Sequence, residues 1–561
     1  MSVRACGIPA TVAALLTVAS CRTVAPRAEP TATSAPTTSA ASPPPTRASS
    51  PPIGAVPPTT ARLEPQKLPM PSIDPLRVMQ RFRSSVDSMV NDAQFASAHW
   101  GILIVDPERA DTLYSRNADK LFMPASNQKI ITSAVSLAQL GADYHWRTPV
   151  LLRGEAKGHT FVGDVLVVGT GDPTWSDAMR NGEAMTAFAP IADALSVRGI
   201  TKIEGKLIAE GNAFSDATTG FGWAFDDFDS AYSAPTDELF FNEGFFTLTA
   251  RAGKKVAGLL TVATSPTKAF PKIVVRAVSR ERTDTLVGKR PFEVQWDSTA
   301  TVVEVTGTLP LGDSISVEVP YRHPNDAVLA AIGETLTARG ISIVPPRVAK
   351  TVRKIVERET ALTKTASTHA ADTLVILNSP PLSDALKRMD KPSQNQLAEL
   401  FYKTTALEKT GVGSADSARA VVQRQLGAWG IPSEGIAVRD GSGLSRHDYI
   451  APRTLVRVLD VMRTSSTFEA FYTALPIAGV DGTIANRMKG TVAAGNVHAK
   501  TGTVDKARSL SGYVTTADGH MLVFSFLCNN FTVPTRAVEK VQDAIAVQLA
   551  SMRLRDAQAN K

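Results

Sequence analysis

The sequence has 561 residues, of which 43% are hydrophobic, so it can bury a sizeable core and is longer than a single domain usually runs. Its formal net charge of +7 at pH 7 comes from Lys and Arg residues spread along the chain, not from a basic block. This distribution argues against specific nucleic-acid binding and favours weak attraction to an anionic cell envelope. The three cysteines, Cys6, Cys21 and Cys528, predict no disulfide framework.

The first 21 residues resemble an export signal. Arg4 gives a positive start, and the apolar run over residues 8–19 is too short to span a bilayer as a permanent helix. Residues 18–21 (Val-Ala-Ser-Cys) resemble a bacterial lipobox, in which the cysteine receives a lipid before cleavage. We expect a signal peptide with lipobox over 1–21, export to the periplasm or cell envelope, and a membrane anchor through lipidated Cys21. The alternative is ordinary cleavage nearby, with Cys21 incidental.

Residues 22–69 are dominated by Pro, Ala, Thr and Ser and contain almost no large apolar side chains. Such a segment cannot bury enough apolar surface to offset the entropy lost on folding. We expect a disordered linker, which could be a tether with useful reach or a simple spacer.

Two helices and a hairpin are predicted next. The first helix begins at Asp74-Pro75 and carries apolar residues at helical spacing as far as Val90. Residues 100–105 and 111–115 are typical of the two strands of a hairpin. Pro124 is expected to open the second helix. The apolar face of this helix comprises Ile130, Ala134, Leu137 and Leu140.

The C-terminal end supplies elements of the same kinds. Residues 509–516 and 521–527 are strand-like and joined by an Asp518-Gly519 turn, and a helix with apolar residues from Val538 to Met552 follows. Together the two ends predict an α+β fold with an antiparallel sheet flanked by helices. Between them, short β-like runs such as residues 165–168 and 302–305 indicate one or two mostly β insertions. The predicted divisions are 70–150, 151–375 and 376–561.

Ser126 and Lys129 are a candidate nucleophile and base. If a helix begins near Pro124, the three-residue spacing puts the hydroxyl and the amine on one helix face, within hydrogen-bonding reach. The helix N-terminus favours negative charge developing on Ser126. Lys129 can accept the serine proton if burial or a second cation lowers its pKa.

Two further elements match the S-x-N and K-T-G patterns of penicillin-binding proteins and serine β-lactamases. They are Ser393 with Asn395, and Lys500 with Thr501 and Gly502. Gly502 would let a substrate backbone approach a strand closely. Each of the three short patterns also occurs once where a structural explanation suffices. These copies are residues 265–268 beside a proline, 115–117 in the predicted hairpin, and 409–411 at a helix end, where glycine is a common C-cap.

The order and context of the motifs, together with longer segments, resemble the D-alanyl-D-alanine carboxypeptidase/endopeptidase family of low-molecular-mass, class C penicillin-binding proteins. The longer segments are residues 171–174 (GDPT), 440–446 (DGSGLSR), 475–483 (LPIAGVDGT), 500–503 (KTGT) and 510–513 (LSGY). The resemblance covers nearly everything after the linker. It implies a serine β-lactamase/transpeptidase-like domain interrupted by two smaller, mostly β inserted domains.

The resemblance also implies residue roles. Ser126 would attack the D-Ala-D-Ala carbonyl and form an acyl-enzyme, with Lys129 as general base, and Ser393 and Lys500 would relay the proton to the leaving amine. Asn395 would hydrogen-bond the substrate amide, and Thr501 and Thr503 would bind the terminal carboxylate. The backbone N–H groups of Ser126 and Thr503 would form the oxyanion hole. Peptidoglycan stem peptides are then the expected substrates, and β-lactam antibiotics the expected covalent inhibitors.

Some positions depart from the family pattern or leave a choice. Gln394 stands where the family often has Asp, and Ala451 should weaken a helix N-cap. Trp223 and Asp226 lie in a segment that, in some family members, is near the substrate side chain. Asp226 beside aromatic surface could receive the amino group of a diamino acid, although a packed loop explains the same residues.

No cofactor or metal is expected, since the histidines form no ligand-spaced motif, and His498 fits an ordinary strand residue. One rival function is a β-lactamase, which shares the acylation chemistry but hydrolyses its penicilloyl ester quickly. Another is a non-catalytic peptidoglycan-binding lipoprotein. The sequence leaves open carboxypeptidase against endopeptidase action, the diamino acid of the stem peptide, the inner or outer membrane, and the oligomeric state.

Overall fold

The computed structural model describes residues 75–268, 270–345 and 371–554. The predicted signal peptide (1–21), the predicted lipid on Cys21 and the predicted linker (22–69) lie outside the described residues. The described residues belong to one compact unit, and the divisions predicted at 150 and 375 inside it stay predictions. Within the described ranges, no helix combines the length and apolar character needed to cross a membrane.

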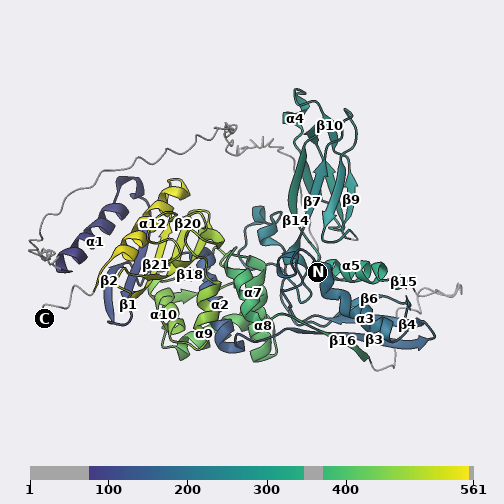
Figure 1. Cartoon of the computed structure of the whole chain (residues 1–561), viewed down its shortest axis with the longest axis horizontal. Helices are drawn as coiled ribbons and strands as arrows, with labels where there is room; N and C mark the ends of the chain where they lie inside the picture. The colour runs from purple at the N-terminus through teal and green to yellow at the C-terminus, as the bar shows by residue number, and fades with distance from the viewer. Residues whose placement is uncertain (1–74, 269, 346–370, 555–561) are drawn as a thin grey trace, which may run out of the picture. The chain divides into compact units, whose positions relative to one another are not determined.

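The two ends of the chain build one five-stranded antiparallel sheet, as predicted (Figure 1). Its strand order is β19-β20-β21-β1-β2, so a strand from each end pairs at its centre. The bounds are β1 His99–Asp106, β2 Asp111–Arg116, β19 His498–Val504, β20 Ala507–Thr515 and β21 Met521–Asn529. Within the described ranges, β19 is an edge strand, bridged on its outer side only between Ile477 and His498. An edge strand can pair with an extended peptide.

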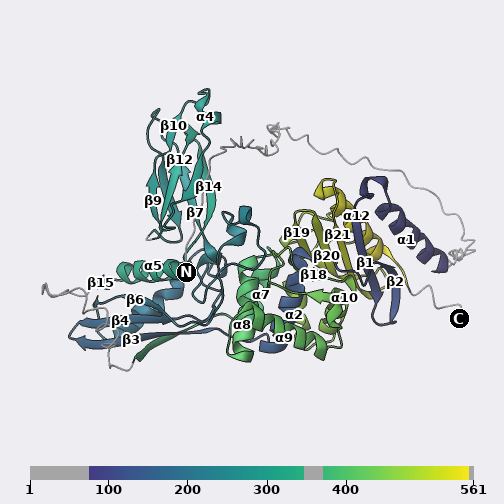
Figure 2. The same ribbon diagram turned by 180° about the vertical axis from the view of Figure 1, so that it is seen from behind.

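Helices cover both faces of this sheet. On one face α1 (Pro75–Val90) and α12 (Thr535–Ser551) lie next to each other in both views (Figures 1 and 2). Their apolar residues and those of the sheet form one buried cluster, and both helices agree with the predicted ones. The helices of the other face are α2 Gln128–Leu140, α7 Leu382–Asp390, α8 Asn395–Thr410, α9 Ala415–Ala428, α10 Pro452–Arg463 and α11 Phe468–Ala474.

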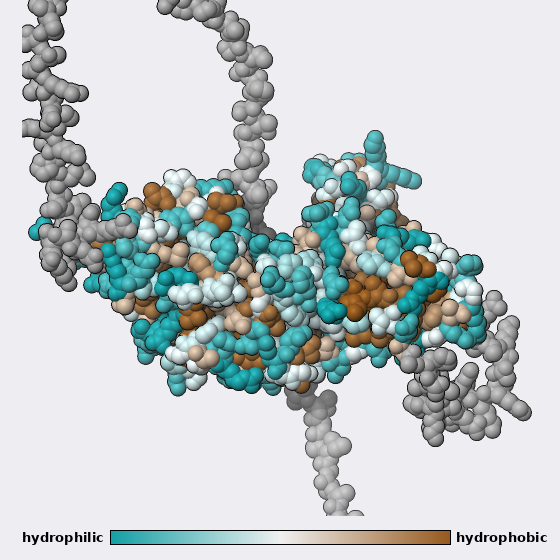
Figure 3. Space-filling view, turned by 60° about the horizontal axis from the view of Figure 1, so that its bottom comes forward, coloured by the Kyte–Doolittle hydropathy of each residue, from teal (hydrophilic) through white to brown (hydrophobic). Residues whose placement is uncertain are grey.

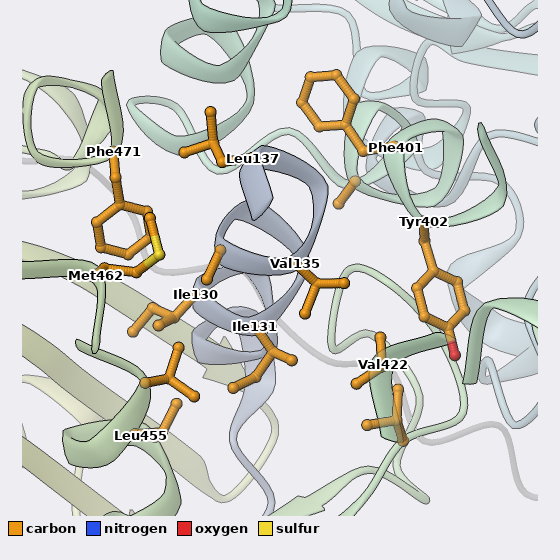
Figure 4. Packing of buried hydrophobic residues seen from close by; sticks show 14 of the residues in the cluster. Ile130, Ile131, Val135, Leu137, Phe401, Tyr402, Val422, Leu455, Met462 and Phe471 are labelled. Carbon is orange, nitrogen blue, oxygen red and sulfur yellow. The ribbon is translucent and has the colours of Figure 1, made fainter. Parts of the chain in front are cut away.

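Helix α2 runs through the core of this second layer. Its residues Gln128 to Leu137 are all buried. Figure 4 shows its apolar side chains projecting on several sides, with Leu455, Met462 and Phe471 on one side and Phe401, Tyr402 and Val422 on the other. Because α2 is enclosed, the residues at its N-terminus are held rigidly.

The middle of the chain forms separate sheets, which agrees with the predicted mostly β insertions. One sheet has the order β15-β5-β4-β3-β16, with β6 also paired to β4. Its strands are β3 Arg147–Lys157, β4 Thr160–Val168, β5 Lys202–Glu204, β6 Leu207–Glu210, β15 Ser342–Val344 and β16 Asp372–Asn378, and it is accompanied by α3 Ala189–Val197 and α5 Pro324–Ala338.

Three smaller sheets occupy residues 245–320, with the orders β14-β7-β8, β11-β12-β9 and β10-β13. Their elements are β7 Phe245–Arg251, β8 Thr261–Ser265, β9 Lys272–Val275, β10 Val278–Arg280, α4 Leu286–Lys289, β11 Glu293–Trp296, β12 Val302–Thr306, β13 Thr308–Pro310 and β14 Ser314–Pro320. A short pair, β17 Ile436–Ala437 and β18 Tyr449–Ile450, lies outside this region. The face seen in Figure 3 is mostly hydrophilic, with its hydrophobic residues in separate patches.

The local expectations for the duplicate motifs are also met. Gly411 is a left-handed C-cap of α8 with φ 77°, so residues 409–411 have the structural role expected of them. Residues 115 and 116 end the hairpin strand β2, and Asn117 follows it. Ser265 ends β8, and residues 266–268 continue from it without forming a helix. Ala451 precedes α10 and makes no side-chain cap hydrogen bond.

Candidate active site

Ser126 lies on a tight turn immediately before α2. The expectation that Pro124 opens this helix is wrong, because Ala125 adopts a left-handed φ of 48° and a short 3-10 helix, Ala125–Asn127, follows. The regular helix begins only at Gln128. The turn keeps Ser126 next to the N-terminal end of α2, where the helix dipole favours negative charge.

Side-chain hydrogen bonds join the turn that carries Ser126 to the five-stranded sheet. The Asn127 amide donates to the Lys500 carbonyl at 2.7 Å and accepts from the Ser511 hydroxyl at 2.7 Å. Ser509 donates to the Pro124 carbonyl at 2.7 Å. The nucleophile turn is therefore fixed against β19 and β20.

Glycine is required on two sides of this turn. A Cβ atom at Gly502 would lie 2.2 Å from Ser509 Oγ and 2.5 Å from the Pro124 carbonyl oxygen. A Cβ at Gly443 would lie 1.9 Å from the Ala125 carbonyl oxygen. The sequence predicted Gly502 for close approach of a substrate backbone, and the structure adds that it lets β19 touch the nucleophile turn.

Lys129 is fully buried behind Ser126. Its ammonium donates to Ser126 Oγ at 3.0 Å, to Asn395 Oδ1 at 2.6 Å and to the Ser442 carbonyl at 2.9 Å. Burial lowers the pKa of Lys129 to about 8, because removing the ammonium from water disfavours its charged form. The first and second motifs thus meet at one amine that can lose its proton near neutral pH.

Buried carboxylates oppose this effect of burial. Asp440, Asp390 and Glu399 each favour the protonated form of Lys129. Glu399 accepts hydrogen bonds from the backbone N–H groups of Gly441 at 3.1 Å and Ser442 at 2.9 Å. It therefore holds the loop whose carbonyl accepts from Lys129.

Lys500 is the second fully buried lysine of the site. Its ammonium donates to the Thr501 carbonyl at 3.1 Å. The pKa of Lys500 lies well below its usual range, chiefly through burial and then through the charge of Lys129, whereas Asp390 acts in the opposite direction. Because burial and the charge of Lys129 both disfavour its charged form, the Lys500 amine is suited to proton transfer.

The second motif lies at the start of α8. Ser393 has a left-handed φ of 69° and lines the cavity described below. Gln394, at the position where the family often has Asp, caps α8 by accepting from the Gln396 backbone N–H at 3.0 Å. Asn395 donates to the Tyr232 carbonyl at 2.8 Å, so its side chain links Lys129 to the middle segment of the chain.

These residues surround a cavity of about 710 Å³. Its lining residues are Ser126, Asp226, Asp227, Tyr232, Ser393, Asn395, Gly443, Leu444, Arg446, Thr483, Thr501, Gly502, Thr503, Val504, Asp505 and Arg508. Trp223 does not line the cavity: it is buried and its indole N–H donates to Asp440 Oδ2 at 2.9 Å. His498 also lies apart, stacked on Tyr472 at 3.9 Å in β19.

Several lining residues were not singled out from the sequence. Asp227 belongs to the same segment as Asp226, Tyr232 follows that segment, and Arg446 belongs to the DGSGLSR loop, so neighbouring signals existed for them. Arg508 lies in β20, and no pattern in the sequence indicated it. Among the described residues, no group of three or more His, Cys, Asp or Glu side chains is arranged to hold a metal ion.

Comparisons with known proteins identify the family of the chain. A model of the D-Ala-D-Ala carboxypeptidase 3 (S13) family matches residues 82–552. A D-alanyl-D-alanine carboxypeptidase from Actinomadura sp. (strain R39) is 31% identical over 496 residues, which cover 84% of this chain and 85% of the relative.

Solved structures give the same fold. Penicillin binding protein 4 of Haemophilus influenzae matches with a TM-score of 0.67 and 22% identity, covering 84% of this chain and 99% of that protein. Its complex with a β-lactam matches with a TM-score of 0.63 and 21% identity over the same shares. The family model and the Actinomadura relative together place this chain in the S13 family of D-Ala-D-Ala carboxypeptidases, which are serine peptidases.

Proposed function

We propose that this chain removes the terminal D-alanine from peptidoglycan stem peptides through an acyl-enzyme on Ser126. The hydroxyl oxygen of Ser126 attacks the carbonyl of the penultimate D-alanine while the neutral amine of Lys129 takes its proton. D-alanine leaves with a proton, and water then hydrolyses the ester. The observation that carries this proposal is the 3.0 Å contact between Lys129 Nζ and Ser126 Oγ at the wall of the cavity.

The other motif residues take complementary roles. Ser393 and Lys500 relay the proton to the leaving amine, and Asn395 hydrogen-bonds the substrate amide. The hydroxyls of Thr501 and Thr503 bind the terminal carboxylate. The backbone N–H groups of Ser126 and Thr503 stabilise the oxyanion, because fixed donors need no reorganisation as charge develops.

Asp226 receives the amino group of a stem-peptide diamino acid. Its position in the cavity lining supports this role, as does the 87% exposure of the adjacent Phe225, which offers aromatic surface beside the carboxylate. Trp223 is buried and hydrogen-bonded to Asp440, and so anchors the loop that carries Asp226.

The protein acts in the cell envelope and is acylated by β-lactams. Export through the signal over residues 1–21 and a lipid on Cys21 would hold it at a membrane, with residues 22–69 as a tether. A Cys21→Ser variant should then stay soluble after cell fractionation, whereas the unchanged chain should sediment with membranes. Equal sedimentation of both would refute the lipid anchor.

The test of the catalytic proposal has two measurements on the same protein. Mass spectrometry after brief incubation with benzylpenicillin should show a penicilloyl adduct on Ser126, and Ser126→Ala should show none. A diacyl-L-Lys-D-Ala-D-Ala peptide should release D-alanine only with the unchanged chain. Crosslinked muropeptides should release their monomers if the chain is also an endopeptidase.

Each alternative function has its own outcome. A β-lactamase would form the adduct and release penicilloic acid rapidly, with little D-alanine from the peptide. A non-catalytic binding protein would show neither adduct nor release, and an adduct that persisted in Ser126→Ala would refute the assignment of the nucleophile.

A further inference from the structure

Arg508 is a cation in the wall of the active-site cavity that belongs to none of the three motifs. It lies in β20 directly opposite Thr503 of β19. Side chains opposite each other in an antiparallel pair share one face of the sheet, as do residues two apart in a strand. Thr501, Thr503 and Arg508 therefore share a face, and all three line the cavity.

Within the described part of the chain, the Arg508 guanidinium has one ion-pair partner, and some of its N–H donors have no acceptor. The side chain is 11% exposed, and its Nη2 forms an ion pair with Glu539 of α12. Its buried Nε has no acceptor among the described residues. An arginine has five N–H donors, so this guanidinium can bind a second anion while it keeps Glu539.

The proposed substrate brings such an anion into the cavity. Its terminal carboxylate would lie at the hydroxyls of Thr501 and Thr503, which are neutral. Lys500 is buried and its pKa is lowered well below its usual range, so it is a poor permanent cation. Burial also lowers the pKa of Arg508, but a guanidinium stays protonated near neutral pH. Among the described lining residues, the cations are Arg446, in the loop that follows β17, and Arg508, beside the threonines.

We propose that Arg508 binds the terminal carboxylate of the substrate and so determines the specificity for a free C-terminus. This inference rests on the proposed function and extends it by one residue. The carboxylate accepts charge-assisted hydrogen bonds from the guanidinium and from the two threonine hydroxyls. Glu539 of α12, which packs on this face of the sheet, fixes the position of the guanidinium through their ion pair.

The experiment compares two substrates that differ only at the C-terminus, diacyl-L-Lys-D-Ala-D-Ala and its C-terminal amide. A hydrogen bond to a charged group contributes about 1.5–3 kcal/mol, so Arg508→Gln should lower kcat/KM for the acid by roughly 10- to 100-fold. The amide should change little, and the preference for the acid should collapse. Arg508→Lys keeps the charge without the planar fork and should retain part of the preference.

Arg487→Gln is the matched control. Arg487 is also a mostly buried arginine that pairs with α12, through Asp543 at 2.7 Å, but it does not line the cavity. Its loss should leave the ratio of acid to amide unchanged. If the amide is not turned over, its binding can be measured as protection of Ser126 from a fluorescent penicillin.

The outcomes separate this inference from the function on which it rests. An unchanged ratio in both Arg508 variants, or an equal fall for acid and amide, would overturn the carboxylate contact. If the unchanged chain releases no D-alanine and takes no penicillin label, the proposed function fails and this inference fails with it.

Discussion

The carboxylate of Glu243 accepts hydrogen bonds from Arg388 at 2.6 Å and from Gln394 at 3.2 Å. Glu243 belongs to the middle of the chain, where it is buried with a left-handed φ of 58°. Arg388 precedes the second motif, and Gln394 is its middle residue. Ser393, between them, also has a left-handed backbone. Such conformations persist only where neighbouring contacts hold them, so Glu243 helps to position the second motif.

Glu243→Gln should therefore weaken both catalysis and stability. We expect kcat/KM for D-alanine release to fall about tenfold, and the free energy of unfolding by about 1–3 kcal/mol, because Arg388 loses a partly buried partner. Kinetics and urea unfolding check this. Asp193→Asn removes the exposed pair between Asp193 and Arg339 and should cost at most about 1 kcal/mol with full activity. Full activity of Glu243→Gln would show that the insertion does not position the motif.

Gly502→Ala should disable the site with a modest effect on the fold. The new methyl group would displace Ser509 and the nucleophile turn, so the rate of penicilloylation should fall by about 100-fold or more, in line with a small misplacement of a reacting group. Gly427, in α9, has open space where an added methyl group would lie, so Gly427→Ala should keep the rate and add up to about 1 kcal/mol of stability. Equal rates for both variants would contradict the tight contact at Gly502.

Periodicity and turn residues were enough to predict the hairpin β1–β2, the strands β20 and β21 and the helices α1 and α12, because these signals are local. The regular part of α2 begins later than predicted, since the turn before it packs closely against Gly443 and Gly502 from distant segments. Glu243 and Gln394 are 151 positions apart in the sequence. Local sequence patterns cannot predict a contact over such a separation. The motifs identified the reacting groups, whereas Arg508 required the register of β19 and β20.

The rate of acylation should rise with pH through about 8. Lys129 acts as a base only when it is neutral, and its pKa is lowered to about 8 by burial, so the neutral fraction grows as the pH passes this value. The second-order rate constant of penicilloylation, measured between pH 6 and 10, gives this pH–rate profile and its rising part. Lys129→Arg, which cannot lose its proton, should reduce the rate about 100- to 10,000-fold. A rate independent of pH over this range would exclude Lys129 as the base.

Glu399→Gln should shift the rising part of this pH–rate profile to lower pH. Glu399 is buried, and its negative charge favours the protonated form of Lys129, as the charges of Asp440 and Asp390 do. Burial raises the pKa of Glu399 itself to about 7, so the carboxylate is ionised in the range where Lys129 titrates. Removing the charge while keeping an amide oxygen for the Gly441 and Ser442 N–H groups should lower the pKa of Lys129 further. At about pH 8, where Glu399 is mostly ionised, the variant should then reach a larger fraction of its own maximal acylation rate than the unchanged chain does. An unchanged pH–rate profile would mean that Glu399 only supports the loop of Gly441 and Ser442. A shift of the profile to higher pH would contradict the electrostatic argument.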